Sequence, residues 1–475
     1  MADNERLGRR VEQLLRDKFG KSSEKIDPNQ LSLFAQEIIA AYQAENAAPK
    51  EPTPRAKGGG GRKAPRPDLP TEKETYELNE EQKKCPECKG DRNVIGSESY
   101  KELEYIPGSF KVIEHVQLKY SCKSCQGHVE LAPRTGSQPI AKGMSGFGLL
   151  AQIITSRYCD HLPLYRQEQI YWRQGAEIAR STMCRWMQAC ASKAKQLYIV
   201  EKEEVLKSKY IHADETPIKF IKKGAGQAQT GYAWTYLGDE QHRYLVFEFH
   251  PNRNHEHAQN FLKDYDGFVQ ADGYQGYDAL HDAAKAKRLS CMAHFRRYFE
   301  KALSSDHAAA GEALARINVL YKIEENAKDK SEDERFELRQ RDAMPRLDDF
   351  KSWLQELSTR KLPKSPVGKA IYYGLGRWEK LSRYTEKGFL PIDNNPAERA
   401  LRPVAIGRKN WMFLGDEDAG ETFSILASLS NTCKIHGVDP FKYWKDILRR
   451  LTNNDYDSLQ DLLPDRWQAK YAGCI

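Results

Sequence analysis

The stretch KYIHADETPIKFI, residues 209–221, decides how the middle of this chain folds. It is strand-like and apolar up to Asp214, and two more strands are expected after it, YAWTYLGD (232–239) and HRYLVFEFH (242–250). A glycine-containing loop joins the first pair of strands and a short polar turn joins the second pair. The pattern therefore predicts three consecutive antiparallel strands, with Asp214 on the first.

Helices and strands alternate after these three strands. HEHAQNFLKDY (255–265) is predicted to be a helix, and GFVQADG (267–273) a buried fourth strand that leads to Asp272. A short helix and a fifth strand, RLSCMAH (288–294), follow. This is the element order of a ribonuclease-H-like core, in which the first and fourth strands lie side by side. We therefore expect Asp214 and Asp272 to meet.

A third carboxylate, Glu398, begins a strongly basic helix in the stretch IDNNPAERALRPVAIGRKNW (392–411). Two aspartates a few ångströms apart repel each other unless a cation lies between them. Mg²⁺ takes oxygen ligands, only a few of them from protein, and paired ions of this kind catalyse phosphoryl transfer. Asp214, Asp272 and Glu398 therefore predict a site for two Mg²⁺ or Mn²⁺ ions.

Each carboxylate also has a local explanation. Asp214 could accept hydrogen bonds from the next two backbone amides, and Asp272, which precedes a glycine, could be a turn residue. Asn395 and Glu398 fit the two ends of a helix-capping arrangement. Each explanation is sufficient for one residue, but together they do not explain why three carboxylates should converge in one fold.

Length, charge and apolar content indicate which classes of protein this chain is compatible with. The 475 residues carry a net charge of +7 and are enough for two to four domains. Basic residues are concentrated in particular segments, which indicates a nucleic-acid partner. We find no apolar signal region and no apolar run long enough to cross a bilayer, so no membrane association and a cytoplasmic location are expected.

Two CxxC pairs, CPEC and YSCKSC, predict a zinc-ribbon domain over residues 76–133. The expected ligands of its structural Zn²⁺ are Cys85, Cys88, Cys122 and Cys125. Four thiolates at this spacing in a reducing compartment favour tetrahedral zinc. Reduced thiols or a redox pair are the alternative.

The N-terminal part of the chain divides into a helical region, residues 1–46, and a flexible basic linker, residues 47–75. Apolar residues recur at helical spacing in the first segment, and they serve either dimerisation or packing within the chain. The linker has proline, glycine and cations but almost no apolar residues, so it cannot offset the cost of ordering.

Three helices are predicted in residues 134–204, and we expect a helix-turn-helix DNA-binding domain there. The apolar stripe of the third helix consists of Met183, Trp186, Met187 and Cys190. Its outer face, which would contact DNA, carries Arg180, Arg185 and Gln188. A plain three-helix bundle gives the same pattern.

The catalytic core is expected in two parts, residues 205–302 and residues 391–425, where the second part holds the Glu398 helix. A helical insertion over residues 303–390 separates them, and a C-terminal helical segment, residues 426–475, follows. The predicted fold class is therefore multidomain α+β, with a zinc ribbon, a helix-turn-helix and a ribonuclease-H-like α/β core that contains the insertion.

Characteristic stretches occur in a fixed order along nearly the whole chain. They are FGKSSEKIDPNQLSLF, the two CxxC pairs, LPLYRQE with the helices after it, HADETP, QADGYQGY, CMAHFRRYF, DNNPAERALRPVAIGRKNW and NTCKIHGVDPFKYWKDILRRL. In this order they resemble the insertion-sequence-66 family of transposases, which have a DDE-type, ribonuclease-H-like catalytic domain. The N-terminal helical region is shorter than the leucine-zipper-like region usual in that family.

The resemblance implies that Asp214, Asp272 and Glu398 are the catalytic triad, that the four CxxC cysteines bind zinc, and that the helix-turn-helix contacts DNA. The activity it implies is Mg²⁺-dependent cleavage and strand transfer at the ends of an insertion sequence in a bacterial nucleoid. The implied partners are double-stranded DNA, further copies of the chain on that DNA, and accessory proteins of the same element. A DNA-binding regulator with an inactive core, which needs no divalent metal, is the alternative.

Basic residues around Glu398 are expected to neutralise DNA phosphates. These residues are Arg399, Arg402, Arg408 and Lys409. Trp411 either stacks on an unpaired base or belongs to the core. His294 and Arg297 are candidates for orienting the scissile phosphate, with a buried structural histidine as the alternative for His294.

Overall fold

The computed structural model describes most of the chain from residue 143 onward and short pieces before it. The described residues are 73, 75–77, 83–84, 87, 89–91, 108–121, 129–133, 136–141, 143–222, 227–277 and 285–471. The predicted helical region 1–46, most of the linker and all four CxxC cysteines lie outside them. The chain divides into two compact units, and residues 47–114 form a unit of their own.

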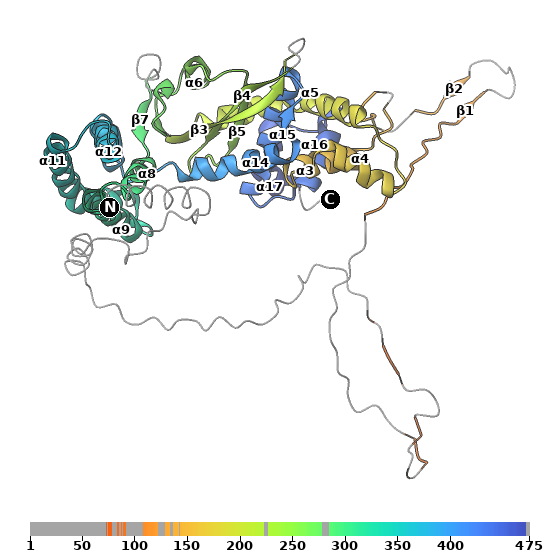
Figure 1. The fold of residues 1–475 in the computed structure, drawn as a ribbon. Coiled ribbons are helices and arrows are strands. Elements are labelled where there is room, and N and C mark those ends of the chain that lie inside the picture. Colours follow the sequence, from red (N-terminus) through yellow and green to blue (C-terminus); the bar gives the residue numbers. More distant parts are fainter. Residues whose placement is uncertain are drawn as a thin grey trace, which may run out of the picture. The chain divides into compact units, whose positions relative to one another are not determined.

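A mixed sheet lies at the centre of the larger unit (Figure 1). Its strands are β3 (Tyr210–Ile221), β4 (Ala228–Leu237), β5 (Leu245–His250), β6 (Phe268–Ala271) and β7 (Lys287–Ser290). Their order is β5-β4-β3-β6-β7, and the two-residue strand β8 (Phe413–Leu414) also pairs with β3. The first three strands are antiparallel, whereas β6 and β7 run parallel to β3. The predicted pairing of the first and fourth strands of this sheet is confirmed.

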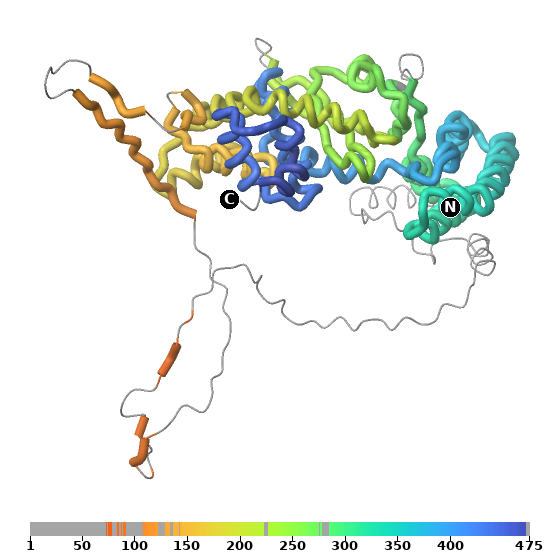
Figure 2. The backbone as a smooth tube through the Cα atoms, turned by 180° about the vertical axis from the view of Figure 1, so that it is seen from behind, coloured from red at the N-terminus to blue at the C-terminus, as the bar shows by residue number. Residues whose placement is uncertain are grey.

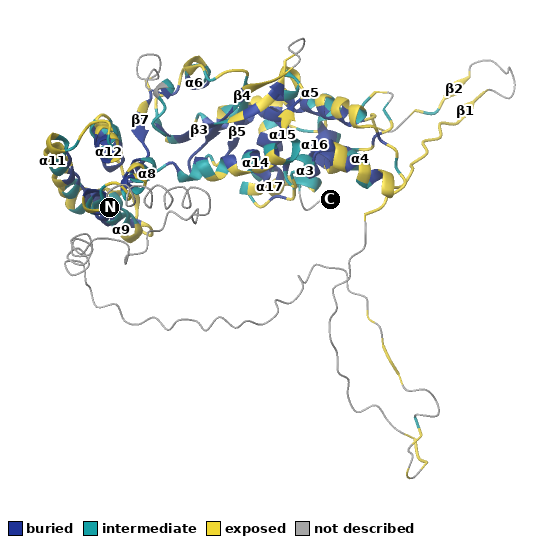
Figure 3. Ribbon diagram, in the orientation of Figure 1, coloured by how far each residue is buried: buried dark blue, intermediate teal, exposed yellow. Residues whose placement is uncertain are grey.

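Helices at one end of the sheet share a single hydrophobic core with it. They are α3 (Phe147–Tyr158), α4 (Leu164–Arg173), α5 (Arg180–Val205), α15 (Glu417–Ile435), α16 (Pro440–Asn453) and α17 (Pro464–Tyr471). Figure 3 shows buried residues running from the strands into these helices. The segments expected as separate domains, 134–204 and 426–475, therefore pack on the core, and the boundary expected after residue 425 falls inside α15.

Helix α15 covers the edge strand β5 through a row of hydroxyl groups. Outward backbone amides of Leu245, Phe247 and Phe249 donate to three hydroxyls spaced one helical turn apart, at 2.8–3.0 Å. The acceptors are Thr432, Ser428 and Ser424. Because an open sheet edge invites pairing with other chains, these side chains satisfy the edge and protect it.

A second hydrophobic core lies at the other end of the sheet, where the helical insertion was predicted. It is built from α8 (Met292–Ala302), α9 (His307–Ala327), α10 (Glu332–Leu338), α11 (Met344–Arg360), α12 (Pro366–Leu375) and α13 (Trp378–Ser382). Figures 1 and 2 show these helices away from the α15–α17 group. Helix α8 begins earlier than the sequence indicated, so His294 lies on a helix and not at a strand end.

Helix α14 (Asn395–Trp411) packs against β3 and β4 and reaches from α8 to α15 within the larger unit. Its first turn carries Glu398, which reaches α8 through Arg297. Its last residue, Trp411, contacts Phe423 on α15. Among the described residues, no helix combines the length and hydropathy that a membrane span requires.

Candidate active site

Strand pairing brings Asp214 and Asp272 to the same place. The register of β3 and β6 pairs His212 with Gln270, and two residues further along the chain lie Asp214, within β3, and Asp272, just after the end of β6. Side chains two residues apart on a strand lie on one face, so Asp214 shares the face of His212, and the Asp272 carboxylate is close enough to raise the pKa of Asp214. The predicted pairing of these two strands is confirmed, and the site that it was expected to form stays a prediction.

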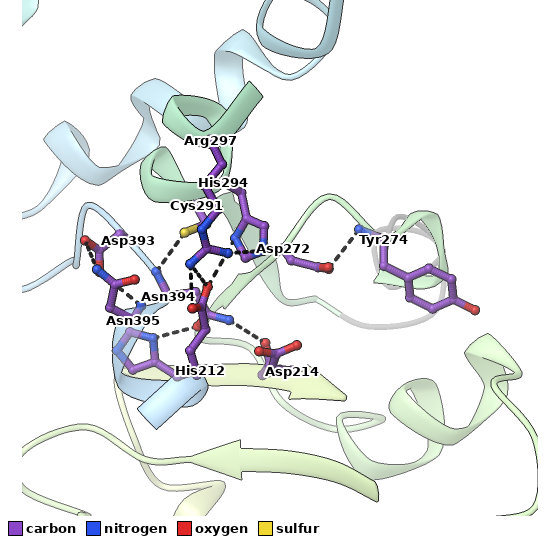
Figure 4. Close-up of polar contacts among 12 residues, drawn as sticks. His212, Asp214, Asp272, Tyr274, Cys291, His294, Arg297, Asp393, Asn394 and Asn395 are labelled. Carbon is purple, nitrogen blue, oxygen red and sulfur yellow. Dashed lines mark hydrogen bonds and ion pairs between the residues drawn. The ribbon is translucent and has the colours of Figure 1, made fainter. Parts of the chain in front are cut away.

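Asn394 fixes the start of the helix that carries Glu398. It is fully buried, and its side-chain amide donates to the Ala213 carbonyl oxygen at 2.8 Å. Its carbonyl oxygen lies 2.9 Å from Nδ1 of His212, and its backbone amide donates to Sγ of Cys291 at 3.1 Å. Asn394 thus ties the start of α14 to β3 and to Cys291, the residue before α8, next to Asp214 (Figure 4). Sequence reasoning missed this role, although the polar run DNN before a proline was its visible sign.

Glu398 pairs with two cationic or polar groups of α8. Nη2 of Arg297 donates to both carboxylate oxygens of Glu398, at 2.7 and 2.5 Å. Nδ1 of His294 lies 3.7 Å from one of these oxygens, and Nη1 of Arg297 lies 3.2 Å from Nε2 of His294. The side chains expected to meet DNA phosphate therefore hold the third carboxylate in this structure.

The helix-capping explanation of Glu398 is wrong. The helix begins one residue earlier than that arrangement required, with Asn394 at the cap position and no cap bond from its side chain. Nδ2 of Asn395 donates to Asp393 instead. The Glu398 side chain therefore pairs with Arg297 and does not cap its own helix.

Each aspartate makes one local hydrogen bond of the kind that was weighed as an alternative. The Glu215 amide donates to Oδ1 of Asp214 at 2.8 Å, and the Tyr274 amide donates to Oδ1 of Asp272 at 2.8 Å. Asp214 lies within β3, however, and not at its end. Each local bond engages Oδ1 only, so it orients the carboxyl group and is compatible with metal binding through the other oxygen.

Burial and neighbouring carboxylates destabilise the ionised form of Asp214. Burial raises the pKa of Asp214 to about 8, and the carboxylates of Glu215, Asp272 and Glu398 add to the rise. Burial likewise lowers the pKa of His212 to about 4, so this ring is neutral at pH 7 and its Nδ1–H donates to Asn394. A cation bound by the carboxylates would lower the pKa of Asp214 again.

A fourth acidic residue, Glu215, supports the site from the other face of β3. It is buried, and Arg253 binds it through Nε at 2.8 Å and through a second guanidinium nitrogen. The Tyr277 hydroxyl donates to its other oxygen at 2.8 Å. Arg253 in turn lies over the Tyr274 ring, 3.8 Å from its centroid. This network attaches the loop after Asp272 to β3, and sequence reasoning passed over it.

The predicted DNA-contacting residues fall into two groups. Exposed residues on α5 are Arg180, Arg185 and Gln188, and exposed residues on α14 are Arg399, Arg402 and Lys409. The buried stripe of α5 is as predicted. Arg408 instead donates to the Thr216 hydroxyl at 2.8 Å and to the Pro217 carbonyl at 2.6 Å, which attaches α14 to β3. Trp411 packs against the core beside Gly407.

Among the described residues, no group of three His, Cys, Asp or Glu side chains is arranged so that it could hold a metal ion as it stands. The donor set nevertheless fits a hard divalent cation. It consists of carboxylate oxygens, and burial and neighbouring carboxylates raise the pKa of Asp214, which a bound cation would lower. The four cysteines expected to bind zinc are outside the described residues.

Four models of known protein families match this chain. The model described as "Transposase IS66 family" matches residues 142–422, which include all three carboxylates. The chain belongs to the IS66 transposase family. The model "zinc-finger binding domain of transposase IS66" matches residues 82–126, which include all four CxxC cysteines. The models "IS66 C-terminal element" and "Transposase C of IS166 homeodomain" match residues 428–464 and 6–73.

Relatives in Sinorhizobium fredii are similar over nearly their whole length. The uncharacterized protein y4qI is 31% identical over 96% of this chain and 87% of its own length. The uncharacterized protein y4hP is 29% identical over 98% of this chain and 89% of its own. Membership of the IS66 family, which the order of motifs indicated, is confirmed by the four family models along the chain.

Proposed function

We propose that this chain is a DNA transposase with a ribonuclease-H-like, DDE-type core that cleaves and joins the ends of an insertion sequence. The observation that carries the proposal is the pairing of the parallel strands β3, which contains Asp214, and β6, which leads directly into Asp272, beside the anchored first turn of α14. Membership of a transposase family supports the same activity. The strand order β5-β4-β3-β6-β7 supports the fold assignment.

Asp214, Asp272 and Glu398 would hold the divalent ions. Two Mg²⁺ or Mn²⁺ ions, when bound, supply activation of the attacking water or 3′ hydroxyl and stabilisation of the leaving oxygen. The chain's own contribution is positional: Asn394 fixes the turn that presents Glu398, and the Glu215–Arg253 pair fixes the loop of Asp272. Arg297 neutralises Glu398 before the site is loaded.

Release of Glu398 would leave Arg297 and His294 at the edge of the site. We expect these two side chains then to face the scissile phosphate, because both lie on α8 within reach of Glu398. A guanidinium suits this task since its planar donors match phosphate oxygens. The same α8 residues thus serve the unloaded and the loaded site.

DNA and zinc complete the proposal. The exposed cations of α5 and α14 would contact DNA phosphates and groove edges. Cys85, Cys88, Cys122 and Cys125 would bind a structural Zn²⁺, which the family match to a zinc-finger domain supports. Neither assignment depends on the carboxylate site.

The test is cleavage and joining of DNA that carries the element's own inverted repeats, with Mg²⁺ or Mn²⁺. Asp214→Asn, Asp272→Asn and Glu398→Gln should each abolish both reactions and leave DNA binding nearly unchanged. Asp264→Asn, which alters an exposed aspartate away from the site, is the matched control and should keep activity. Wild-type activity in any of the three site variants would refute the catalytic assignment.

A further inference from the structure

A pocket of about 670 Å³ opens beside the candidate catalytic loop and extends to the helical insertion. Asp272 and Gly273 line one side, and the aromatic and basic side chains Tyr298, Lys369, Tyr372 and Arg377 line much of the rest. Its size is that of sites that hold one small molecule. His294 also lines the pocket. The functions proposed above for Asp272 and His294 do not explain why a pocket of this size is present.

The wall of the pocket is attached directly to the Asp272 loop. The Tyr373 ring lies so close to Gly273 that a Cβ on that glycine would meet it at 2.7 Å. Arg377 donates to the Gly273 carbonyl at 3.0 Å, and its guanidinium lies 4.6 Å from the Tyr373 centroid. Tyr298 stacks on Tyr373 with centroids 4.3 Å apart. The chain from α12 to Arg377 is therefore in direct contact with the loop that holds Asp272.

The chemistry of the lining indicates a flat polar ring next to an anion. Tyr298 and Tyr372 are 39% and 50% exposed, so each presents ring surface to a ligand. The Tyr373 hydroxyl is buried and has no hydrogen-bond partner among the described residues. Lys369 is exposed on the same helix and supplies positive charge. Aromatic faces with a nearby cation are how proteins bind unpaired bases of a nucleic-acid strand.

We propose that this pocket receives one unpaired nucleotide of the DNA immediately beside the scissile phosphate. The inference rests on the proposed function, because Asp272 both lines the pocket and would bind the metal at the cut. A paired base keeps its faces stacked inside the duplex, so it must leave the helix to reach Tyr298 and Tyr372. Lys369 then faces the backbone of the displaced nucleotide.

The experiment compares binding of fluorescein-labelled inverted-repeat duplexes in Ca²⁺, which we expect to allow binding without cleavage. One set is fully paired, and in the others a single unpaired nucleotide is moved through the positions flanking the cleavage site. We expect the wild-type chain to bind one of these duplexes about 10-fold more tightly than the paired one, since unpairing is already complete. Tyr298→Ala and Tyr372→Ala should each reduce that preference to less than about threefold, because base stacking is lost.

Matched controls come from the same helical insertion. Phe336 is a 40% exposed aromatic residue on α10 and Lys351 an exposed lysine on α11, and neither lines the pocket. Phe336→Ala should keep the wild-type preference. Lys369→Gln should lower the slope of log affinity against log salt by about 1, whereas Lys351→Gln should not change it. Thermal melts identify any variant that is unfolded, and Tyr372→Ala, at an exposed position, serves if Tyr298→Ala does not fold.

Two outcomes would overturn the proposal: no preference for an unpaired nucleotide at any position, or a preference that survives both tyrosine substitutions. A parallel Mg²⁺ cleavage assay on the same DNA separates this from the proposed function. Cleavage without a pocket-dependent preference refutes the pocket alone. A pocket-dependent preference without cleavage refutes the transposase activity and leaves the nucleotide site.

Discussion

Substitution of Asn394 by alanine tests how the molecule presents Glu398. The side chain of Asn394 is buried and bridges His212 to the Ala213 carbonyl, so it joins α14 to β3 at the residue before Asp214. Asn394→Ala removes both hydrogen bonds and leaves the His212 Nδ1–H and the carbonyl without this partner. The first turn of α14 then loses its fixed position.

The magnitude follows from the number of buried groups left without their partner. Each such group costs about 1–3 kcal/mol, so two should lower the free energy of unfolding by about 2–6 kcal/mol. Cleavage should fall further than stability explains, by about 100-fold at a temperature where both proteins are folded, because a displacement near 1 Å at a catalytic group has that effect. DNA affinity should change by less than about threefold, since Asn394 has no exposed atoms to offer a ligand.

Urea unfolding followed by tryptophan fluorescence gives the stability, and single-turnover cleavage with saturating Mg²⁺ gives the rate. Asn395→Ala is the control, because that side chain donates only to Asp393 beside it, and we expect a loss of at most about 1 kcal/mol. The reasoning is refuted if Asn394→Ala loses less than about 1 kcal/mol and cleaves at the wild-type rate.

Three further predictions concern other parts of the chain. Arg408→Ala should lower the free energy of unfolding by about 1–2 kcal/mol because it binds Thr216 and Pro217, whereas exposed Arg402→Ala should weaken DNA binding only; equal effects in urea unfolding would contradict this assignment. Burial raises the pKa of Glu201 to about 8 from 4.5, so its contribution to stability is complete below pH 4.5 and is lost as the pH rises through 8. Glu201→Gln should therefore be more stable than wild type at pH 9 by up to about 5 kcal/mol, and an unchanged pH profile of unfolding would count against this. Removal of zinc by a chelator should weaken binding to the element's ends, measured by anisotropy, and unchanged affinity after verified metal loss would exclude a recognition role for the cysteines.

The sequence determined the elements and the identity of the family. Strand and helix periodicity depends on neighbouring residues, so the strands of the central sheet and the buried stripe of α5 could be read locally. The order of three antiparallel strands followed by alternating elements was enough to place the strand that contains Asp214 beside the strand that leads to Asp272. Strand register is set by the hydrophobic pattern, which is a property of sequence alone.

Only the tertiary structure decided which groups those carboxylates meet. Asn394 and His212 are 182 residues apart, and Arg297 and Glu398 are 101 apart, and no local pattern specifies such pairs. The same is true of the pocket, whose walls come from α8, α12 and the Asp272 loop, and of the α15 hydroxyls that cover β5. A local pattern can place a side chain on a face of its own element, but its partner across a packed interface depends on how every element fits into the shared cores.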